Sequence, residues 1–279
     1  MSELLAYVNG GIVPLETAAV GVLDRGFLYG DGLFETIRVS GGRPVRLSAH
    51  LDRLRAGAGV IGLLDAVSRL DLESAIRSLL DASSLANARL RLTVTGGRCD
   101  LPGALAARPA EPTVVITAHP LATSDPKPAR VTISTIRRDE SNPLCRVKSL
   151  NYLPAVMARI EAESVGADEA ILLNSRGSVT EGTVSNLFLV RGRRLVTPSL
   201  DQGPLPGTVR AAVIAIAPQL GLEVSERAVE VSELSQADEM FLTNAIHLAR
   251  PIREFNGKPI GAAGFPITAQ VLQALRALD

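Results

Sequence analysis

The sequence has few cysteines, no excess of charge of either sign and no long hydrophobic run. Cys99 and Cys145 are its two cysteines, and they have no metal-ligand spacing, so reduced thiols in a cytosolic protein are the simpler interpretation. Lysine plus arginine and aspartate plus glutamate both number 29, so no basic excess favours a nucleic-acid partner. No apolar run reaches the ~18 residues that a membrane helix needs.

Two further motifs are absent. Residues 1–5 lack the basic region and the long apolar region of a signal peptide, so we expect a cytoplasmic protein. The glycine-rich segment 24–32 matches neither a P-loop nor a dinucleotide fingerprint. At 279 residues, with 46% hydrophobic and 21% charged residues, the chain is instead typical of a globular protein with one large or two ordinary domains.

Periodicity and turn signals predict an alternation of strands and helices. Asn9-Gly10 predicts a hairpin turn within residues 6–14, and Ser48 is a candidate cap for the helix that follows it. The remaining elements are helices expected over residues 71–82, 151–165, 205–220 and 267–278, and strands expected over residues 33–39, 90–95, 113–118, 131–136, 169–173, 179–181, 186–190, 224–231 and 239–243.

Strands grouped in each half of the chain, with helices between them, predict an α+β protein of two lobes. The proline-rich segment 119–129 is the best candidate for a linker, so we expect an N-terminal domain over 1–118 and a C-terminal domain over 130–279. Residues 96–111 form a long loop rich in glycine, proline and alanine, a kind of loop that is often functional.

The predicted chemistry depends on two residues, Lys148 and Glu181. Lys148 ends an extended segment, and its amine would form an imine if burial or a nearby cation lowered its pKa. Glu181 precedes a Gly-Thr turn and would keep a pyridine nitrogen protonated. Tyr152, four residues after Lys148, is expected on the same helical face, where its hydroxyl would bond a ring oxygen.

Four other residues would hold an anion. Gly207-Thr208 at the start of a helix offers free backbone N–H groups and the positive end of the helix dipole. Thr243, after a strand, would add a hydroxyl, and Arg53 would add a positively charged guanidinium group. Together with the lysine and the carboxylate, these roles describe a site for pyridoxal 5′-phosphate. Each feature alone is commoner as ordinary surface or turn structure.

At this point the residues resemble a known family, the fold-type IV (class IV) pyridoxal-phosphate enzymes. The family includes branched-chain aminotransferases, D-amino-acid aminotransferases and aminodeoxychorismate lyases. The resemblance covers nearly the whole chain, and these segments carry it: Asp24-Arg25-Gly26, Tyr29-Gly30-Asp31-Gly32-Leu33-Phe34-Glu35, His50-Leu51-Asp52-Arg53-Leu54, Lys148-Ser149-Leu150-Asn151-Tyr152-Leu153, Gly166-Ala167-Asp168-Glu169-Ala170, Val179-Thr180-Glu181-Gly182-Thr183, Asn186-Leu187-Phe188 and Leu205-Pro206-Gly207-Thr208-Val209-Arg210.

The resemblance implies a fold and a set of roles. It implies a two-domain fold like that of D-amino-acid aminotransferases, with a small N-terminal α+β domain, a larger barrel-like C-terminal α/β domain, and a homodimer with its active sites near the interface. Lys148 resembles the Schiff-base lysine. The implied cofactor residues are Arg53, Lys148, Tyr152, Glu181, Gly207, Thr208, Val209 and Thr243, and the implied substrate residues are Tyr29, Phe34, Arg38, Arg98, Asn244 and Ala245.

The subfamily stays open on the sequence. Tyr152 after Lys-Ser-Leu-Asn resembles the branched-chain group, whereas Thr243-Asn244-Ala245 resembles the lyases. Phe34 stands where D-specific enzymes typically have a tyrosine. We expect an aminotransferase that exchanges an amino group between a small or branched apolar amino acid and a 2-oxo acid. The alternatives are an aminodeoxychorismate lyase that releases pyruvate and 4-aminobenzoate, and a non-enzymatic scaffold with the same fold.

Overall fold

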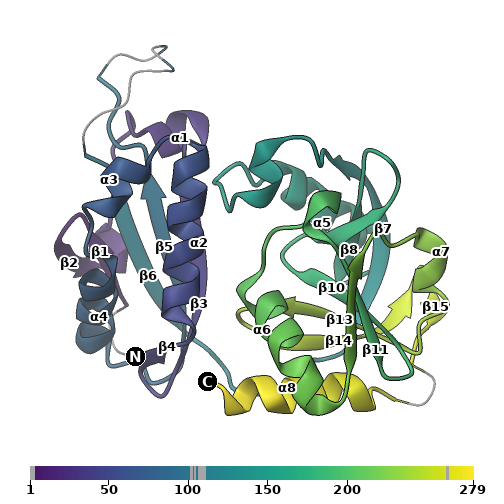
Figure 1. Cartoon of the computed structure of the whole chain (residues 1–279). Coiled ribbons are helices and arrows are strands. Elements are labelled where there is room, and N and C mark those ends of the chain that lie inside the picture. Colours follow the sequence, from purple (N-terminus) through teal and green to yellow (C-terminus); the bar gives the residue numbers. More distant parts are fainter. Residues whose placement is uncertain (1–3, 101–102, 104, 106–110, 262–263) are drawn as a thin grey trace. The chain divides into compact units, whose positions relative to one another are not determined.

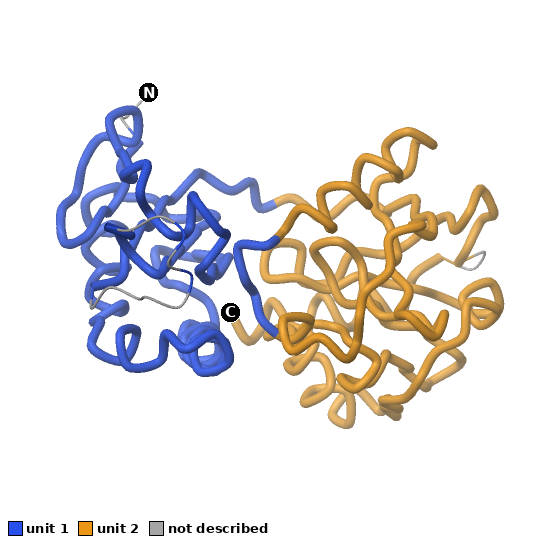
Figure 2. The backbone as a smooth tube through the Cα atoms, turned by 90° about the horizontal axis from the view of Figure 1, so that it is seen from above, with its two compact units in different colours: residues 1–123, 147–151 blue, residues 124–146, 152–279 orange. Residues whose placement is uncertain are grey.

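The structure is a computed structural model that describes residues 4–100, 103, 105, 111–261 and 264–279. Contacts between Cα atoms divide the chain into two units, which Figure 2 colours separately. Unit 1 comprises Met1–Thr123 and Val147–Asn151, and unit 2 comprises Ser124–Arg146 and Tyr152–Asp279. The chain therefore leaves unit 1 within the predicted linker 119–129, and its segment 147–151 belongs to unit 1.

Unit 1 is an antiparallel sheet covered by helices. Within the described residues the sheet has six strands in the order β2-β1-β6-β5-β3-β4. The strands are β1 (Leu5–Val8), β2 (Gly11–Pro14), β3 (Gly32–Ser40), β4 (Arg43–Pro44), β5 (Ala88–Thr95) and β6 (Val114–Pro120). The helices are η1 (Leu15–Thr17), α1 (Arg25–Tyr29), α2 (Leu47–Val60), α3 (Leu64–Ser68) and α4 (Leu72–Ser83).

The core of unit 1 lies between this sheet and helices α2, α3 and α4 (Figure 1). Side chains alternate between the two faces of β3, so Leu33, Ile37 and Val39 point into the core, where they pack with apolar residues of α2 and α4. Glu35 lies between Leu33 and Ile37 in the same alternation, so a carboxylate also faces the core. The opposite face of β3 carries Phe34.

Unit 2 is built on a larger mixed sheet that curls like part of a barrel (Figure 1). Its order is β12-β11-β10-β13-β14-β7-β8-β9, with β15 paired to β14. The strands are β7 (Ala129–Arg138), β8 (Glu169–Asn174), β9 (Val179–Gly182), β10 (Asn186–Arg191), β11 (Arg194–Pro198), β12 (Glu223–Arg227), β13 (Glu239–Asn244), β14 (Leu248–Phe255) and β15 (Lys258–Pro259). The helices are η2 (Pro143–Arg146), α5 (Leu153–Ser164), η3 (Leu200–Gln202), α6 (Thr208–Ile216), η4 (Ala217–Leu220), α7 (Val231–Leu234) and α8 (Pro266–Ala277).

The central strands of unit 2 are buried on both faces. Along β10, Leu187 and Leu189 belong to one apolar cluster, while Phe188 and Val190 belong to a second cluster with α6 and α8. Phe188 stacks on Phe241 of β13 with ring centroids 5.1 Å apart. This two-sided burial explains the continuous apolar run of β10, which is typical of a strand covered on both sides. The predicted α+β class is confirmed.

Several local predictions need correction. Helix α2 begins at Leu47 after Arg46, which adopts a left-handed conformation, so Ser48 is not its cap. The predicted strand 224–231 ends at Arg227, and Val231 begins α7 instead. Strand β14 was not predicted, because its Pro251 and Arg residues obscure the alternation. Parts of the predicted loop 96–111, namely 101–102, 104 and 106–110, lie outside the described residues. No helix in the described ranges combines the length and the hydropathy that a membrane span requires.

The Glu239 carboxylate, at the start of β13, fixes the beginning of α8. It accepts hydrogen bonds from the backbone N–H groups of Ile267 and Thr268 at 2.9 and 2.8 Å and from the Thr268 hydroxyl at 2.7 Å.

We expect Glu239→Ala to lower the free energy of unfolding by about 2–3 kcal/mol, because buried donors lose a charged acceptor. Urea unfolding measures the change. The control is Glu223→Ala, which removes an exposed ion pair with Arg194 and should cost below about 1 kcal/mol. Equal losses in the two variants would contradict the assigned role.

Candidate active site

Lys148 lies on an extended segment that pairs with β3. The Phe34 N–H donates to the Lys148 carbonyl at 2.9 Å, and the Leu150 N–H donates to the Gly32 carbonyl at 3.0 Å. The Lys148 Nζ lies 4.4 Å from the centroid of the Phe34 ring, a cation–π contact. Arg91 places its guanidinium carbon 3.9 Å from the same centroid. The Lys148 amine and the Arg91 guanidinium group therefore both contact the Phe34 ring.

Arg53 is held on α2 by a buried network. Its Nε and Nη2 donate to the two carboxylate oxygens of Glu35 at 2.8 and 2.6 Å, and His50 Nδ1 lies 2.6 Å from the same carboxylate. Glu35 is completely buried, and the Arg53 side chain is 11% exposed. Burial by itself would raise the pKa of Glu35, but hydrogen bonds from His50 and Arg53 outweigh it and hold that pKa below its ordinary value. Burial lowers the pKa of His50, so its ring is neutral near pH 7.

The predicted substrate residues of unit 1 lie in different surroundings. Phe34 contacts Lys148 as described, and Arg38 lies on the same face of β3. The Tyr29 hydroxyl, at the end of α1, accepts a hydrogen bond from the Gly103 N–H at 2.8 Å. Arg98 is exposed and pairs with Asp100 at 2.9 Å, so it contacts none of the other three in the described interactions.

Glu181 of β9 is held by three donors in unit 2. Its Oε1 lies 3.1 Å from Arg138 Nη1, and its Oε2 accepts from Asn186 Nδ2 at 3.2 Å and from the Leu205 N–H at 3.0 Å. Glu181 is 6% exposed. A buried carboxylate with this many donors is an acceptor of fixed orientation, which suits it to bond an N–H group of a ligand.

Asn186 connects Glu181 to the start of helix α6. Its amide also donates to the Leu205 carbonyl at 2.9 Å, and a Cβ placed on Gly207 would lie 1.9 Å from its Oδ1. Gly207 is the N-cap of α6, and Thr208 and Val209 begin the helix. Backbone N–H groups at the start of a helix attract anions. Glu181 and the helix start are therefore joined through one side chain.

Thr243 lies opposite Asn186 in the register of β10 and β13. Its hydroxyl oxygen is buried and has no hydrogen-bond partner among the described residues. An unsatisfied buried hydroxyl costs free energy unless a ligand or an ordered water completes it. The next residue, Asn244, closes a turn by accepting from the N–H groups of Ile246 and His247, and Ala245 lies within that turn.

Tyr152 does not lie where the spacing predicted. Residues 147–151 form no helix, and Tyr152 precedes α5 as its N-cap, so it shares no helical face with Lys148. Its hydroxyl donates to the Thr183 carbonyl at 3.2 Å. That bond places Tyr152 beside the turn that follows Glu181, in unit 2. The prediction failed because it assumed a helix through Lys148.

Several polar residues of these networks were not predicted as site residues, namely Glu35, His50, Arg91, Arg138 and Asn186. Glu35 had a usable signal, because a charged residue stands at a core-facing position of an alternating strand. Arg138, which holds Glu181 and also donates to the Gly203 carbonyl at 2.7 Å, had none in the sequence. The pairing of these distant residues follows from strand order.

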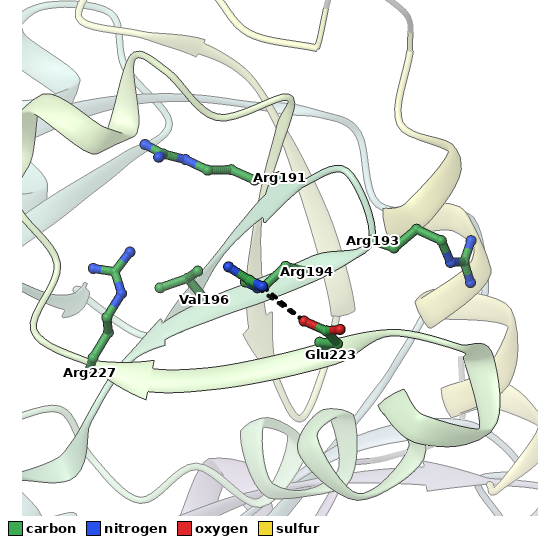
Figure 3. Close-up of a pocket in the computed structure, with 6 residues that line it drawn as sticks. All are labelled: Arg191, Arg193, Arg194, Val196, Glu223 and Arg227. Carbon is green, nitrogen blue, oxygen red and sulfur yellow. Dashed lines mark hydrogen bonds and ion pairs between the residues drawn. The ribbon is translucent and has the colours of Figure 1, made fainter.

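A separate cleft of about 300 Å³ lies beside β11 and β12 (Figure 3). Its lining residues are Arg191, Arg193, Arg194, Val196, Glu223 and Arg227. Carboxylates pair with three of its guanidinium groups: Glu223 lies 3.0 Å from Arg194, and Glu233 lies 2.6 Å from Arg227 and 3.8 Å from Arg191. No predicted site residue lines this cleft, so it is not part of the candidate site.

Comparison with known families decides the classification. The family model described as amino-transferase class IV matches residues 32–255. The chain belongs to the class IV aminotransferases. The resemblance inferred from the sequence motifs is therefore confirmed, and so are the fold and the assignment as an enzyme.

Individual relatives of this class IV aminotransferase have three activities in their names. A putative branched-chain-amino-acid aminotransferase of Methanocaldococcus jannaschii is 36% identical over 91% of this chain and 88% of its own length. A D-alanine aminotransferase of Bacillus licheniformis is 33% identical, covering 96% and 94%. An aminodeoxychorismate lyase of Bacillus subtilis is 34% identical, covering 87% and 83%.

Solved structures agree with this classification. The branched-chain aminotransferase of Thermoproteus uzoniensis with norvaline superposes with a TM-score of 0.89 at 30% identity, covering 99% of this chain and 94% of its own. The branched-chain aminotransferase of Thermobaculum terrenum, described as its PLP-form, has a TM-score of 0.86 at 27% identity, with coverage of 99% and 94%. The family implies pyridoxal phosphate as cofactor.

The contact between Gly207 and Asn186 generates a prediction. In Gly207→Ala the new Cβ would displace the Asn186 amide, which holds Glu181, so we expect the affinity for pyridoxal phosphate to fall on the order of tenfold, as for one lost buried hydrogen bond. Titration of the apo-protein by visible absorption measures this. Gly59→Ala on α2, where a Cβ meets open space, should bind within twofold of the original chain. A Gly207→Ala variant that also binds within twofold would refute the link.

Proposed function

We propose that this class IV aminotransferase transfers an amino group from a small or branched apolar amino acid to a 2-oxo acid such as 2-oxoglutarate or pyruvate. The observation that carries the proposal is the unit 2 network, in which Asn186 and its strand pairing connect Glu181, the start of α6 and the Thr243 hydroxyl. That hydroxyl is buried and has no partner among the described residues. The M. jannaschii relative and the norvaline-bound neighbour support branched-chain substrates.

The residues of unit 2 fit pyridoxal phosphate. The α6 N–H groups at Thr208 and Val209 would bind the phosphate, and Thr243 would donate its buried hydroxyl to it, which satisfies that group. Glu181 would accept from the ring N–H, and Arg138 and Asn186 would keep its carboxylate oriented. When bound, the cofactor supplies an electron sink that stabilises a carbanion at Cα of the amino acid.

Unit 1 would contribute Lys148 and Arg53. The Lys148 amine would hold the cofactor covalently and then carry the proton from Cα of the substrate to the cofactor. Its contact with the Phe34 ring restricts the amine to one side of the extended segment. Arg53 bonds Glu35 through Nε and Nη2, and it would bind the phosphate through the Nη1 side of its guanidinium group. Tyr152 would bond the ring oxygen.

Substrate recognition remains a proposal at six positions. Phe34, beside the lysine amine, would contact the apolar side chain of the substrate, and Tyr29 and Arg38 would flank it. Asn244 and Ala245 would present the turn after β13 to the substrate carboxylate. Arg98, which is exposed and paired with Asp100, would be the sixth position.

A lyase is the second candidate. The B. subtilis relative, 34% identical, supports it, and the same lysine and carboxylate would serve the release of pyruvate from aminodeoxychorismate. A lyase would need no 2-oxo acid acceptor, and this difference separates the two functions experimentally.

We also propose a cytoplasmic homodimer. Helix α5 carries an apolar stripe, Leu153, Val156, Met157 and Ile160, whose members are 47–67% exposed at the i, i+3, i+4, i+7 spacing of one helical face. Exposed stripes of this kind mark protein interfaces. The two buried cysteines, which form no disulfide, are consistent with a reducing compartment.

The test of substrate class is the visible spectrum of the cofactor-loaded protein during separate additions of L-leucine, D-alanine and aminodeoxychorismate. We expect L-leucine to bleach the cofactor band and a 2-oxo acid to restore it. A response to D-alanine alone would reverse the proposed handedness. Release of pyruvate from aminodeoxychorismate, without any response to either amino acid, would replace the aminotransferase by the lyase.

Lys148→Ala should abolish turnover while leaving the fold intact, because no other group described near Phe34 can both bind the cofactor covalently and move the proton.

Glu181→Gln should slow turnover by about 10²–10³, which corresponds to the ~3–4 kcal/mol lost when one preorganised electrostatic group is removed. Single-turnover rates and far-ultraviolet circular dichroism check both variants. Full activity in Lys148→Ala, or a Glu181→Gln rate within twofold of the original, would reject the corresponding role.

A further inference from the structure

Glu35 is a buried carboxylate to which the proposed chemistry assigns no part. It lies at the centre of β3, in the alternation that carries Leu33 and Ile37 into the core of unit 1, and it is completely buried. An ionised carboxylate in such surroundings is costly unless its oxygens are satisfied. Its contacts must therefore explain its presence in the core.

Both oxygens of Glu35 accept hydrogen bonds from α2. Arg53 uses its Nε and Nη2 in a bidentate pair, and His50, one turn away, uses Nδ1. Because an ionised carboxylate can only accept, the neutral His50 ring carries its proton on Nδ1. The guanidinium group is planar, so this pairing fixes its orientation and turns the Nη1 side of the fork away from Glu35.

We propose that Glu35 is a positioning residue that holds Arg53 in the orientation in which it binds the cofactor phosphate. This inference rests on the proposed function, in which Arg53 binds that phosphate. Long arginine side chains lose much rotamer freedom on binding an anion. Glu35 already restricts the rotamers of Arg53 in the folded protein, before the phosphate binds.

Charge alone would predict the opposite effect. The negative charge of Glu35 opposes the binding of a phosphate nearby, so its removal would tighten binding if Glu35 acted only through charge. Positioning predicts that its removal weakens binding. The sign of the change therefore separates the two explanations.

Glu35→Gln is the variant that tests this sign. The amide keeps the shape of the side chain but replaces one acceptor oxygen by a donor. Since Arg53 bonds both oxygens and His50 bonds one of them, either orientation of the amide sets a donor against a donor. Glu35→Asp keeps the charge and shortens the side chain by one methylene, so it tests position without charge and serves where Glu35→Gln does not fold.

The experiment compares the affinities of the full-length apo-protein for pyridoxal phosphate and for pyridoxal, which lacks the phosphate, by visible absorption and by protein fluorescence. We expect both Glu35 variants to lose about tenfold in affinity for pyridoxal phosphate, the factor for reordering one long side chain, and to bind pyridoxal within twofold of the original chain. Added inorganic phosphate should compete less well in both variants. These readouts need no turnover.

Glu239→Gln is the matched control, because it changes another buried, hydrogen-bonded carboxylate that holds α8 in unit 2. It should lower stability and leave the preference for the phosphorylated ligand unchanged. Equal losses for pyridoxal phosphate and pyridoxal in the Glu35 variants, or tighter phosphate binding in Glu35→Gln, would overturn the positioning role.

Arg53→Lys separates this inference from the proposed function. If Arg53→Lys leaves the preference for pyridoxal phosphate unchanged, Arg53 does not bind the phosphate, and both the proposed role of Arg53 and the positioning role fail. If Arg53→Lys loses that preference while Glu35→Gln and Glu35→Asp retain it, the role of Arg53 stands and the positioning role alone fails.

Discussion

Backbone pairing between β3 and the segment 147–151 is the constraint on which the lysine depends. The segment comes long after β3 in the chain, yet backbone hydrogen bonds at Lys148 and Leu150 attach it to Phe34 and Gly32. The alternation of β3 then gives the strand two functions. One face carries Phe34 beneath the Lys148 amine, and the other carries Glu35 beneath α2, where it holds Arg53. A single strand therefore positions the Lys148 amine and the Arg53 guanidinium group.

In unit 2, the register between two strands positions the Glu181 carboxylate. Antiparallel pairing of β10 and β13 sets Asn186 opposite Thr243, and the Asn186 amide reaches Glu181 and the chain before α6. The Glu181 carboxylate accepts from Arg138, Asn186 and the Leu205 N–H, whereas the buried Thr243 hydroxyl has no hydrogen-bond partner among the described residues. A buried hydroxyl without a partner is expected where a ligand completes its hydrogen bonds.

The success of sequence-based prediction varied with the range of the interactions. The Asn9-Gly10 hairpin and the helix capped by Asp71 were predicted well, because their signals are contained in a few neighbouring residues. The cap at Ser48 and the shared helical face of Tyr152 and Lys148 were wrong. Near Ser48 the left-handed conformation of Arg46 starts the helix one residue earlier. At Lys148 the chain pairs with the distant strand β3, and local propensity yields to such a contact.

The sequence by itself determined the α+β class and the family, and it singled out Lys148 as the proposed reactive lysine, because turn chemistry, periodicity and ordered motifs are properties of short segments. Only the tertiary structure decided that Glu35 pairs with Arg53 and His50, that Arg138 and Asn186 hold Glu181, and that the Thr243 hydroxyl is left without a partner among the described residues. These pairings join residues on different strands and helices. They depend on register and on the burial of charge, which no local pattern encodes.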